Sequence, residues 1–352
     1  MGDAVTMILK DKNVLLFMPV FFDYSDLLIA ELKRQGAKVF FVENKIQKFD
    51  FSSPSAKLRL IRKVYHKFTD VKWKYVNQFV DWSIRYDIFI AVNGFSYDRR
   101  MIDKLRKTNP AIYTILYLWD STKMFNWSGI ETDFDNSFTF DPLDARKLKI
   151  NYLANFYPQG MKLCINQPTI DLFFVGTQHA DRFKVIWKIY NSINGKQTFF
   201  IKLLIRYRNI LHNKYLYVFL KTLRIRSAAN YIQNYELIER KVDLDYLAYN
   251  TIEASIIEEQ MANARCILDI QSPHQVGLPH QMMKALAMGK KIVTTNTWIA
   301  NYDFYNEKQF LIIDRNNPII SKTFLDEDYQ TEEIHDSISM CRIDLWLSTL
   351  LA

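Results

Sequence analysis

The chain has 352 residues, of which 49% are hydrophobic and 24% charged, and its formal net charge is +8. This length fits two domains of ordinary size, and the apolar share excludes a disordered chain. No apolar run approaches the roughly 20 residues that a membrane-spanning helix needs. The first residues carry acid and lysine where a signal peptide has an uninterrupted apolar core, so we expect a cytoplasmic protein.

The first half of the chain predicts strands that alternate with helices. An apolar run at 13–21 is followed by a helical stretch that ends at Gly36, and a second apolar run follows. This β-α-β opening is typical of a parallel, doubly wound sheet. Three further strand-like runs, each ending in polar residues, cover 86–94, 111–121 and 137–141.

The second half restarts the same pattern. Two prolines at 158 and 168 mark a connector, after which a strand, a glycine, a polar loop and a helix begin near Asp171. Later strand-like runs cover 262–273, 290–296 and 309–315. We therefore expect a Rossmann-like domain at 1–158, a second at 159–335, and a C-terminal helix at 336–352 that crosses back to the first domain.

Positive charge is concentrated in two segments. Residues 184–226 contain ten Lys or Arg and no acid, and residues 57–74 contain seven against one Asp. Both segments interleave these charges with aromatic and apolar residues, which suits an anionic membrane surface. A nucleic-acid surface and an ordinary solvated helical face are the alternatives.

The stretch DIQSPHQVGLPHQMMKALAMGKKIVTTN, residues 269–296, combines a strand end, a tight turn, an apolar helix and a further strand. A helix N-terminus suits phosphate, and Gly277 allows the backbone to approach a ligand closely, while Pro279 fits the first helical turn. An ordinary crossover between two strands is the alternative. His274 and His280 have no third ligand nearby, so no metal site is expected.

Several segments, in the same order, resemble the GT-B glycosyltransferases. SPHQVGLPHQMMKALAMGKKIVTTN is similar to their nucleotide-sugar-binding segment, and the closest group builds bacterial lipopolysaccharide and capsule and includes group 1-like and spore-maturation-protein-like enzymes. YDIFIAVNG, ILYLWDS and SFTFDPLDARK in the first half and DLFFVGTQHADRF in the second extend the resemblance. It implies an α/β GT-B fold, in which two Rossmann-like, doubly wound domains face a central cleft.

The resemblance also implies where the substrates bind. The acceptor would lie on the first domain and the nucleotide-diphosphate sugar mainly on the second, with no metal or other cofactor, because helix amides and basic side chains neutralise the diphosphate. Arg182 would supply charge, although a surface arginine is the alternative. The donor-binding set carried over is Gly176, Thr177, His179, Arg182, Ser272, Gln275, Gly277, Leu278 and Lys284.

One departure from the family pattern concerns two glutamates that related retaining enzymes often carry eight residues apart around this turn. Here the matching residues are Val276 and Lys284, and neither accepts hydrogen bonds as a carboxylate does. Ribose must then be anchored differently, or donor binding is weakened. A catalytically inactive homologue is therefore a second hypothesis.

An inverting transfer needs a general base to deprotonate the acceptor hydroxyl. The candidates at predicted strand ends of the first domain are Asp23, Asp120 and Asp141. Asp120 is the first choice because it ends the most apolar strand. For each of them, a helix N-cap or an ordinary loop carboxylate is the alternative.

The sequence therefore predicts a metal-independent hexosyltransferase on the inner face of the cell membrane, acting on a glycolipid or polysaccharide acceptor. The two basic segments, 57–74 and 184–226, would contact anionic lipid. The rival hypotheses are a non-catalytic homologue with a binding or regulatory role, a nucleic-acid-binding protein, and an epimerase that acts on the sugar nucleotide itself. No nucleic acid is expected as a partner, because the basic charge alone does not explain the strand-end loops.

Overall fold

The computed structural model describes residues 8–45, 70–125, 127, 129–163, 167–193, 197–205, 214–223, 232, 235–236, 246–273, 275–329, 331 and 333–352. They form two compact units. The first unit comprises Met1–Gly160, His274–His280 and Met340–Ala352, and the second comprises Met161–Pro273 and Gln281–Ser339. The loop that ends at His280 therefore belongs to the first unit, whereas the sequence analysis assigned it to the second domain.

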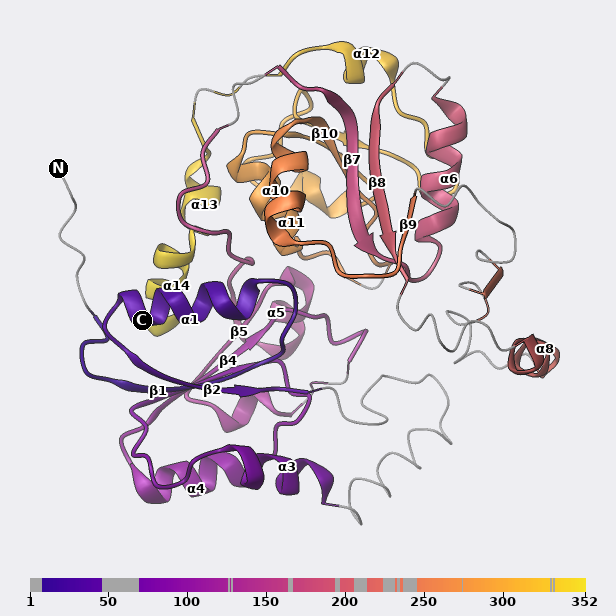
Figure 1. The fold of residues 1–352 in the computed structure, drawn as a ribbon. Helices are drawn as coiled ribbons and strands as arrows, with labels where there is room; N and C mark the ends of the chain where they lie inside the picture. The colour runs from indigo at the N-terminus through magenta and orange to yellow at the C-terminus, as the bar shows by residue number, and fades with distance from the viewer. Residues whose placement is uncertain are drawn as a thin grey trace. The chain divides into compact units, whose positions relative to one another are not determined.

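A six-stranded parallel sheet forms the centre of the first unit, in the order β2-β1-β3-β4-β5-β6 (Figure 1). The strands are β1 (Asn13–Met18), β2 (Lys38–Glu43), β3 (Ile88–Val92), β4 (Tyr113–Leu118), β5 (Asn136–Thr139) and β6 (Asn151–Tyr152). In its register, Leu16 of β1 lies opposite Ile90 of β3. Nearly every residue of β1, β3 and β4 is buried, which explains their continuous apolar runs, since a parallel sheet is covered on both faces.

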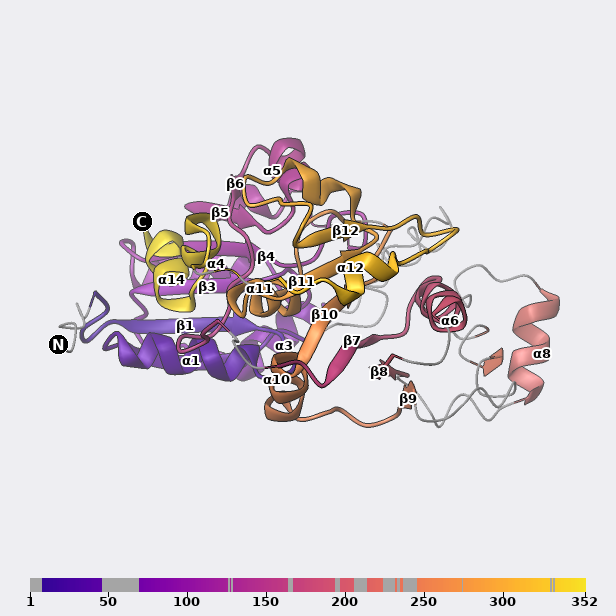
Figure 2. The ribbon, with the colours of Figure 1, turned by 90° about the horizontal axis from the view of Figure 1, so that it is seen from above.

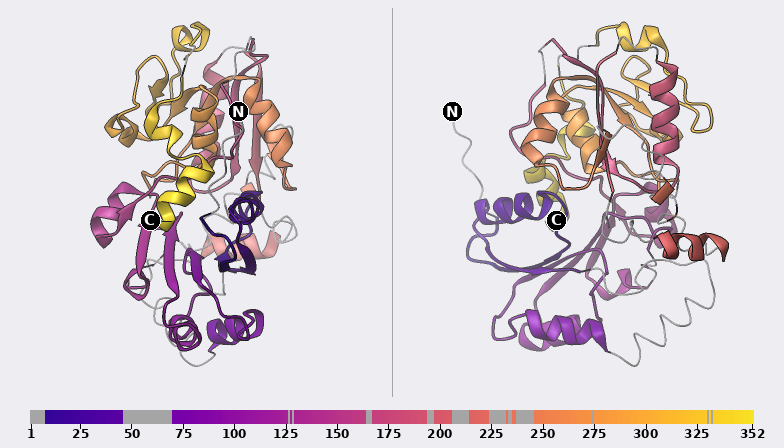
Figure 3. Two further views of the ribbon diagram at one scale, coloured as in Figure 1. Left: turned by 90° about the vertical axis from the view of Figure 1, so that its left-hand side faces the viewer. Right: turned by 45° about the vertical axis from the view of Figure 1, so that its right-hand side comes forward.

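Helices cover both faces of this sheet. They are α1 (Tyr24–Arg34), α3 (Val71–Phe79), α4 (Arg100–Thr108), α5 (Pro142–Leu148) and α14 (Ile343–Leu351), with a short 3-10 helix at Glu131–Asp133. Figure 3 shows α1 and α14 on one face and α3 and α4 on the other. Successive β1 residues alternate between them, because Leu16 packs with α1 and α14 while Phe17 packs with α3 and α4.

The second unit repeats this plan with a sheet in the order β12-β11-β10-β7-β8-β9, again all parallel. Its strands are β7 (Ile170–Thr177), β8 (Phe199–Leu204), β9 (Leu247–Ala248), β10 (Ala264–Asp269), β11 (Lys291–Thr294) and β12 (Phe310–Ile312). Leu172 of β7 lies opposite Cys266 of β10. Both residues belong to the apolar core of this unit.

The helices of the second unit are α6 (Arg182–Ser192), α8 (Lys214–Thr222), α10 (Ala254–Ala262), α11 (His280–Ala287), α12 (Lys322–Asp326) and α13 (Asp336–Ser339), with a 3-10 helix at Thr297–Asn301. Figure 2 shows α10 and α11 on one face of the sheet and α6 and α12 on the other. The expected fold class, two doubly wound α/β sheets, is confirmed. Residues 57–69 of the first basic segment lie outside the described residues.

Candidate functional site

Polar side chains gather at the carboxyl ends of the strands in the first unit. Asn93 follows β3, Asp120 follows β4 and Asp141 follows β5. All the strands are parallel, so these residues lie at the same edge of the sheet, where ligands bind in open α/β sheets. Asp23 follows β1 at this edge as well.

Asp120 is oriented by Asn93. The amide Nδ2 of Asn93 donates to Oδ2 of Asp120 at 2.7 Å, and its Oδ1 accepts the backbone N–H of Trp119 at 3.1 Å. Asn93 is fully buried, adopts a positive φ of 60°, and receives a hydrogen bond on its own carbonyl from Asn44 at 3.0 Å. A buried side chain that is hydrogen-bonded at both ends of its amide holds its neighbour in one orientation.

The protein surroundings also tune this carboxyl group. Burial raises the pKa of Asp120 to about 6, and the hydrogen bonds from Asn93 and Trp119 oppose that rise. A carboxylate with a pKa in this range exchanges protons near neutral pH, which suits a general base. Asp120 is among the residues that the sequence predicts at this edge, whereas Asn93 is not, although the polar end of the 86–94 run indicates it.

Asp141 has a structural role instead. As the N-cap of α5, its Oδ1 accepts the amides of Leu143 and Asp144 at 2.9 and 3.2 Å. Its Oδ2 accepts the amides of Val276 and Gly277 at 2.7 and 3.2 Å. Because both oxygens are engaged by backbone amides, we remove Asp141 from the candidate bases.

The same contacts involve the Gly277 loop. The amides of Val276 and Gly277 donate to the carboxylate of Asp141, so these two donors are engaged within the first unit, and a diphosphate contact at this loop stays a prediction. A Cβ atom on Gly277 would lie 2.6 Å from the carbonyl oxygen of Phe140 and 2.7 Å from its ring. Leu278 is 1% exposed, and its carbonyl accepts Nδ2 of Asn155 at 2.9 Å. Glycine is therefore required here for close packing within the first unit.

An aromatic cluster adjoins Asp120. His280 stacks on Tyr24 with ring centroids 4.1 Å apart, and the edges of Trp119 and Phe156 contact it at 5.4 and 4.8 Å. His280 is therefore a packed residue at the start of α11. His274 lies outside the described residues, and among the residues described, no three His, Cys, Asp or Glu side chains gather as metal ligands do.

Asp23 precedes α1 at the N-cap position, yet its side chain makes no capping hydrogen bond to the helix. It is partly exposed at the same sheet edge as Asp120. Asp23 therefore stays a candidate carboxylate.

In the second unit, Arg182 lies against the ends of two strands. Its Nε donates to the carbonyl of Ile270 at 2.8 Å and its Nη1 to that of Thr177 at 2.7 Å. A Cβ on Gly176 would come within 3.2 Å of this guanidinium, so the glycine leaves room for it. Burial lowers the pKa of Arg182 to about 10, which still leaves it charged at neutral pH.

Arg315, which follows β12, completes a charged cluster that the sequence analysis missed. Its Nε contacts both carboxylate oxygens of Asp181 at 2.8 and 2.9 Å, and its Nη1 donates to the carbonyl of Gln271 at 2.7 Å. Asp269 at the end of β10 accepts the hydroxyl of Thr294 at 2.8 Å, and burial raises its pKa despite the nearby arginines. In the sequence, Asp314 and Arg315 at the end of the 309–315 run are the feature that indicates this cluster.

The other carried-over donor residues are divided between the two units: Thr177, His179 and Ser272 lie at the ends of the neighbouring strands β7 and β10 of the second, and Gln275 belongs to the first. Thr177 and His179 are partly exposed at the end of β7, Ser272 is buried, and Gln275 is partly exposed. Lys284 is buried on α11, where its Nζ forms a 2.6 Å ion pair with Glu258 of α10. Its charge is thus neutralised within the second unit.

A separate cavity of about 1200 Å³ lies in the first unit at the opposite, amino-terminal edge of the sheet. Its lining includes Lys12, Arg34, Asp87 and Arg342. It contains none of the residues selected from the sequence.

Comparisons with known proteins give similarity in structure only. No protein-family model and no curated protein matches the chain. Among solved structures, it is similar to the apo form of the lipopolysaccharide outer core galactosyltransferase WaaB, with 12% identity, 96% of this chain and 98% of that chain covered, and a TM-score of 0.49. It is also similar to the N-terminal domain of Candida albicans trehalose-6-phosphate phosphatase, with 10% identity, coverages of 98% and 96%, and a TM-score of 0.47.

Proposed function

We propose that this protein is a GT-B glycosyltransferase that moves a hexosyl group from a nucleotide-diphosphate sugar to a hydroxyl of a glycolipid or polysaccharide. The observation that carries the proposal is Asp120, a strand-end carboxylate that Asn93 orients and that has a pKa of about 6. A group of this kind at this edge of a doubly wound sheet is suited to acid-base chemistry on a bound substrate.

In the proposed reaction, Asp120 accepts the proton of the acceptor hydroxyl as its oxygen attacks the anomeric carbon. The bond from that carbon to the diphosphate oxygen breaks, and its electron pair leaves with the nucleoside diphosphate. A base of this pKa is unprotonated above about pH 6. Because an inverting transfer needs such a base, the proposed reaction inverts the configuration at the anomeric carbon.

The second unit supplies positive charge for the donor. Arg182 and Arg315 are held by backbone carbonyls and by Asp181, so their orientation is fixed before any ligand binds. Pre-oriented cations stabilise charge that develops on a leaving group more effectively than mobile ones. No metal or other cofactor is part of the proposal.

The acceptor, in this proposal, is reached at an anionic membrane surface on the cytoplasmic side. The charge of segment 184–226, ten Lys or Arg without an acid, supports it. In the part of the chain that the structure describes, no helix is both long and apolar enough to cross a bilayer.

The first experiment is a thermal-shift screen with UDP-, GDP-, dTDP- and CMP-sugars, followed by turnover assays with the donor that binds. A ligand that binds only the folded protein raises the melting temperature. Asp120→Asn should retain the shift and lower kcat/KM by about 10²- to 10⁴-fold, while Asp103→Asn, on the exposed surface of α4, should match the wild type. Full activity of Asp120→Asn would show that Asp120 is not the general base.

A second candidate is a nucleotide-sugar-binding protein without transferase activity. Lys284 favours it, because related retaining enzymes carry a glutamate there and this lysine is occupied by Glu258. Donor binding without turnover, for any acceptor fraction, would select this candidate. Donor consumption without acceptor would instead indicate an epimerase, and absence of any donor shift would contradict both candidates.

A further inference from the structure

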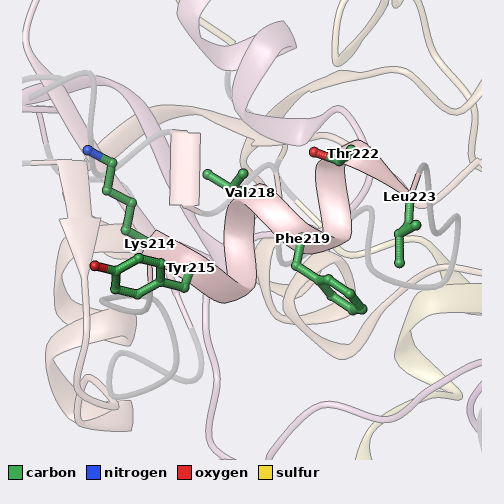
Figure 4. A pocket seen from close by; sticks show the side chains of 6 residues that line it. All are labelled: Lys214, Tyr215, Val218, Phe219, Thr222 and Leu223. Atoms are coloured by element: carbon green, nitrogen blue, oxygen red, sulfur yellow. The ribbon is translucent and has the colours of Figure 1, made fainter.

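Helix α8 exposes an apolar stripe to solvent. Tyr215, Val218, Phe219 and Leu223 are 89%, 49%, 57% and 55% exposed, and no residue of α8 is buried. Their spacing places all four on one face of a helix. Figure 4 shows them along α8 with Lys214 and Thr222, around a shallow hollow of about 610 Å³. We call these four residues the α8 stripe.

The opposite side of α8 is attached to the second unit. The ring of Tyr217 stacks on Tyr235 with centroids 4.2 Å apart, and Tyr235 belongs to the apolar core of that unit. Lys221 donates to Glu236 at 2.7 Å and to the hydroxyl of Tyr217 at 2.6 Å. Leu216, Tyr217 and Leu220 are partly buried on this attached side of the helix, and α8 lies beyond β9 in Figures 1 and 2.

The charge near α8 and the length of this helix indicate which partner fits the α8 stripe. Lys214 is exposed beside it, Lys221 on the attached side pairs with Glu236, and the stretch of sequence that contains α8, residues 184–226, carries ten Lys or Arg and no acid. A nine-residue helix spans about 14 Å, too short to cross a bilayer but suited to lie in its interface. Exposed Tyr, Phe and Leu on one face with lysine beside them are typical of an interfacial helix on anionic lipid.

We infer that α8 is the element that inserts into an anionic membrane, with the α8 stripe among the acyl chains and Lys214 at the headgroups. This deepens the proposed function by naming how the protein would reach a lipid-linked acceptor. The contact itself needs neither donor nor turnover, so it stands on the exposed side chains and the charge of the segment.

The test is co-sedimentation of the full chain with vesicles of phosphatidylcholine, with and without phosphatidylglycerol. The wild type should bind only the anionic vesicles, and high salt should weaken binding. Val218→Ser/Phe219→Ser should lower the partition coefficient about tenfold or more, because two apolar side chains no longer enter the bilayer. Ile319→Ser, 62% exposed in the same unit but outside α8, should bind as the wild type does.

The double variant changes only exposed side chains, so an unchanged melting temperature verifies its fold. Unchanged vesicle binding by it would overturn the inference. So would a dimer in the wild type that the variant loses without any lipid binding, or binding to RNA in place of vesicles. The donor screen separates the two proposals: vesicle binding without any donor shift keeps the α8 inference and rejects the transferase, and a donor shift without vesicle binding does the reverse.

Discussion

Asp120 couples the chemistry of the site to the stability of the fold. Its pKa of about 6 lies above the ordinary aspartate value of 3.8, because burial disfavours the charged form. A group whose pKa is higher in the folded than in the unfolded state stabilises the fold when it is protonated. This stabilisation is fully present below the pKa of the unfolded state and is lost as the pH rises through the pKa of the folded state. At neutral pH the folded protein therefore holds a carboxylate in surroundings that favour the neutral acid.

Asp120→Asn is expected to be more stable than the wild type at pH 8, by about 1–3 kcal/mol, and equally stable near pH 4. The asparagine is neutral at both pH values and can still accept the hydrogen bond from Asn93. Urea unfolding at the two pH values measures the difference in the free energy of unfolding. Asp103→Asn serves as the control, and an equal difference at both pH values would contradict the assignment.

At the scale of elements, the turn between β5 and α5 holds the loop that carries Gly277. Asp141→Asn keeps the size of the side chain but removes the charge that four backbone amides share. We expect a loss of about 1–3 kcal/mol in the free energy of unfolding, since hydrogen bonds to charged groups are the stronger ones.

Hydrogen exchange should locate the loss caused by Asp141→Asn. The amides of Val276 and Gly277 should exchange faster than in the wild type, whereas those of α6 in the second unit should not change. Gln275→Ala, a partly exposed position of the same loop, is the matched control. Uniformly faster exchange in both units would show that Asp141 does not act through this loop.

These contacts also explain how far the sequence could predict the molecule. The apolar runs at 13–21, 111–121 and 262–273 gave strands of both sheets, because a parallel sheet buries both faces and its pattern is local. The role of Gly277 is not local, since its partner Asp141 lies 136 residues earlier. A glycine, a proline and a helix start have the same sequence pattern whether the amides bind a phosphate or the protein's own carboxylate.

The charged cluster of the second unit illustrates the same limit. Arg182 could be predicted from its place after the first strand of the second unit. Arg315 and Asp269 come near it only in the folded chain, because both follow it by more than 80 residues. The position of Asp120 after β4 could be predicted, because a carboxylate that follows an apolar strand is a local pattern, but the same pattern also selects Asp141, which caps α5. The orientation of Asp120 by Asn93 required the order of β3 and β4 in the sheet.

At the scale of the whole molecule, the described residues of each unit have apolar clusters of their own, and the last helix packs in one of the two clusters of the first unit. Trp346 of α14 is fully buried; its indole Nε1 donates to the carbonyl of Ala154 at 2.9 Å, and its ring lies 4.9 Å from that of Tyr117. The apolar cluster of the second unit contains α6, β7 and β10 and has no residue of α14 among its described members.

Trp346→Ala should therefore destabilise the first unit by about 3–5 kcal/mol, the usual loss when a large aromatic side chain is removed from a core. In hydrogen exchange, amides of β1 and β4 should lose protection while those of β7 and β10 keep it. Thr349→Ala, on the exposed face of the same helix, should leave both sheets protected. An equal loss of protection in β4 and β7 would mean that the two units unfold together as one cooperative unit. The two units could not then be treated as independent in donor-binding experiments.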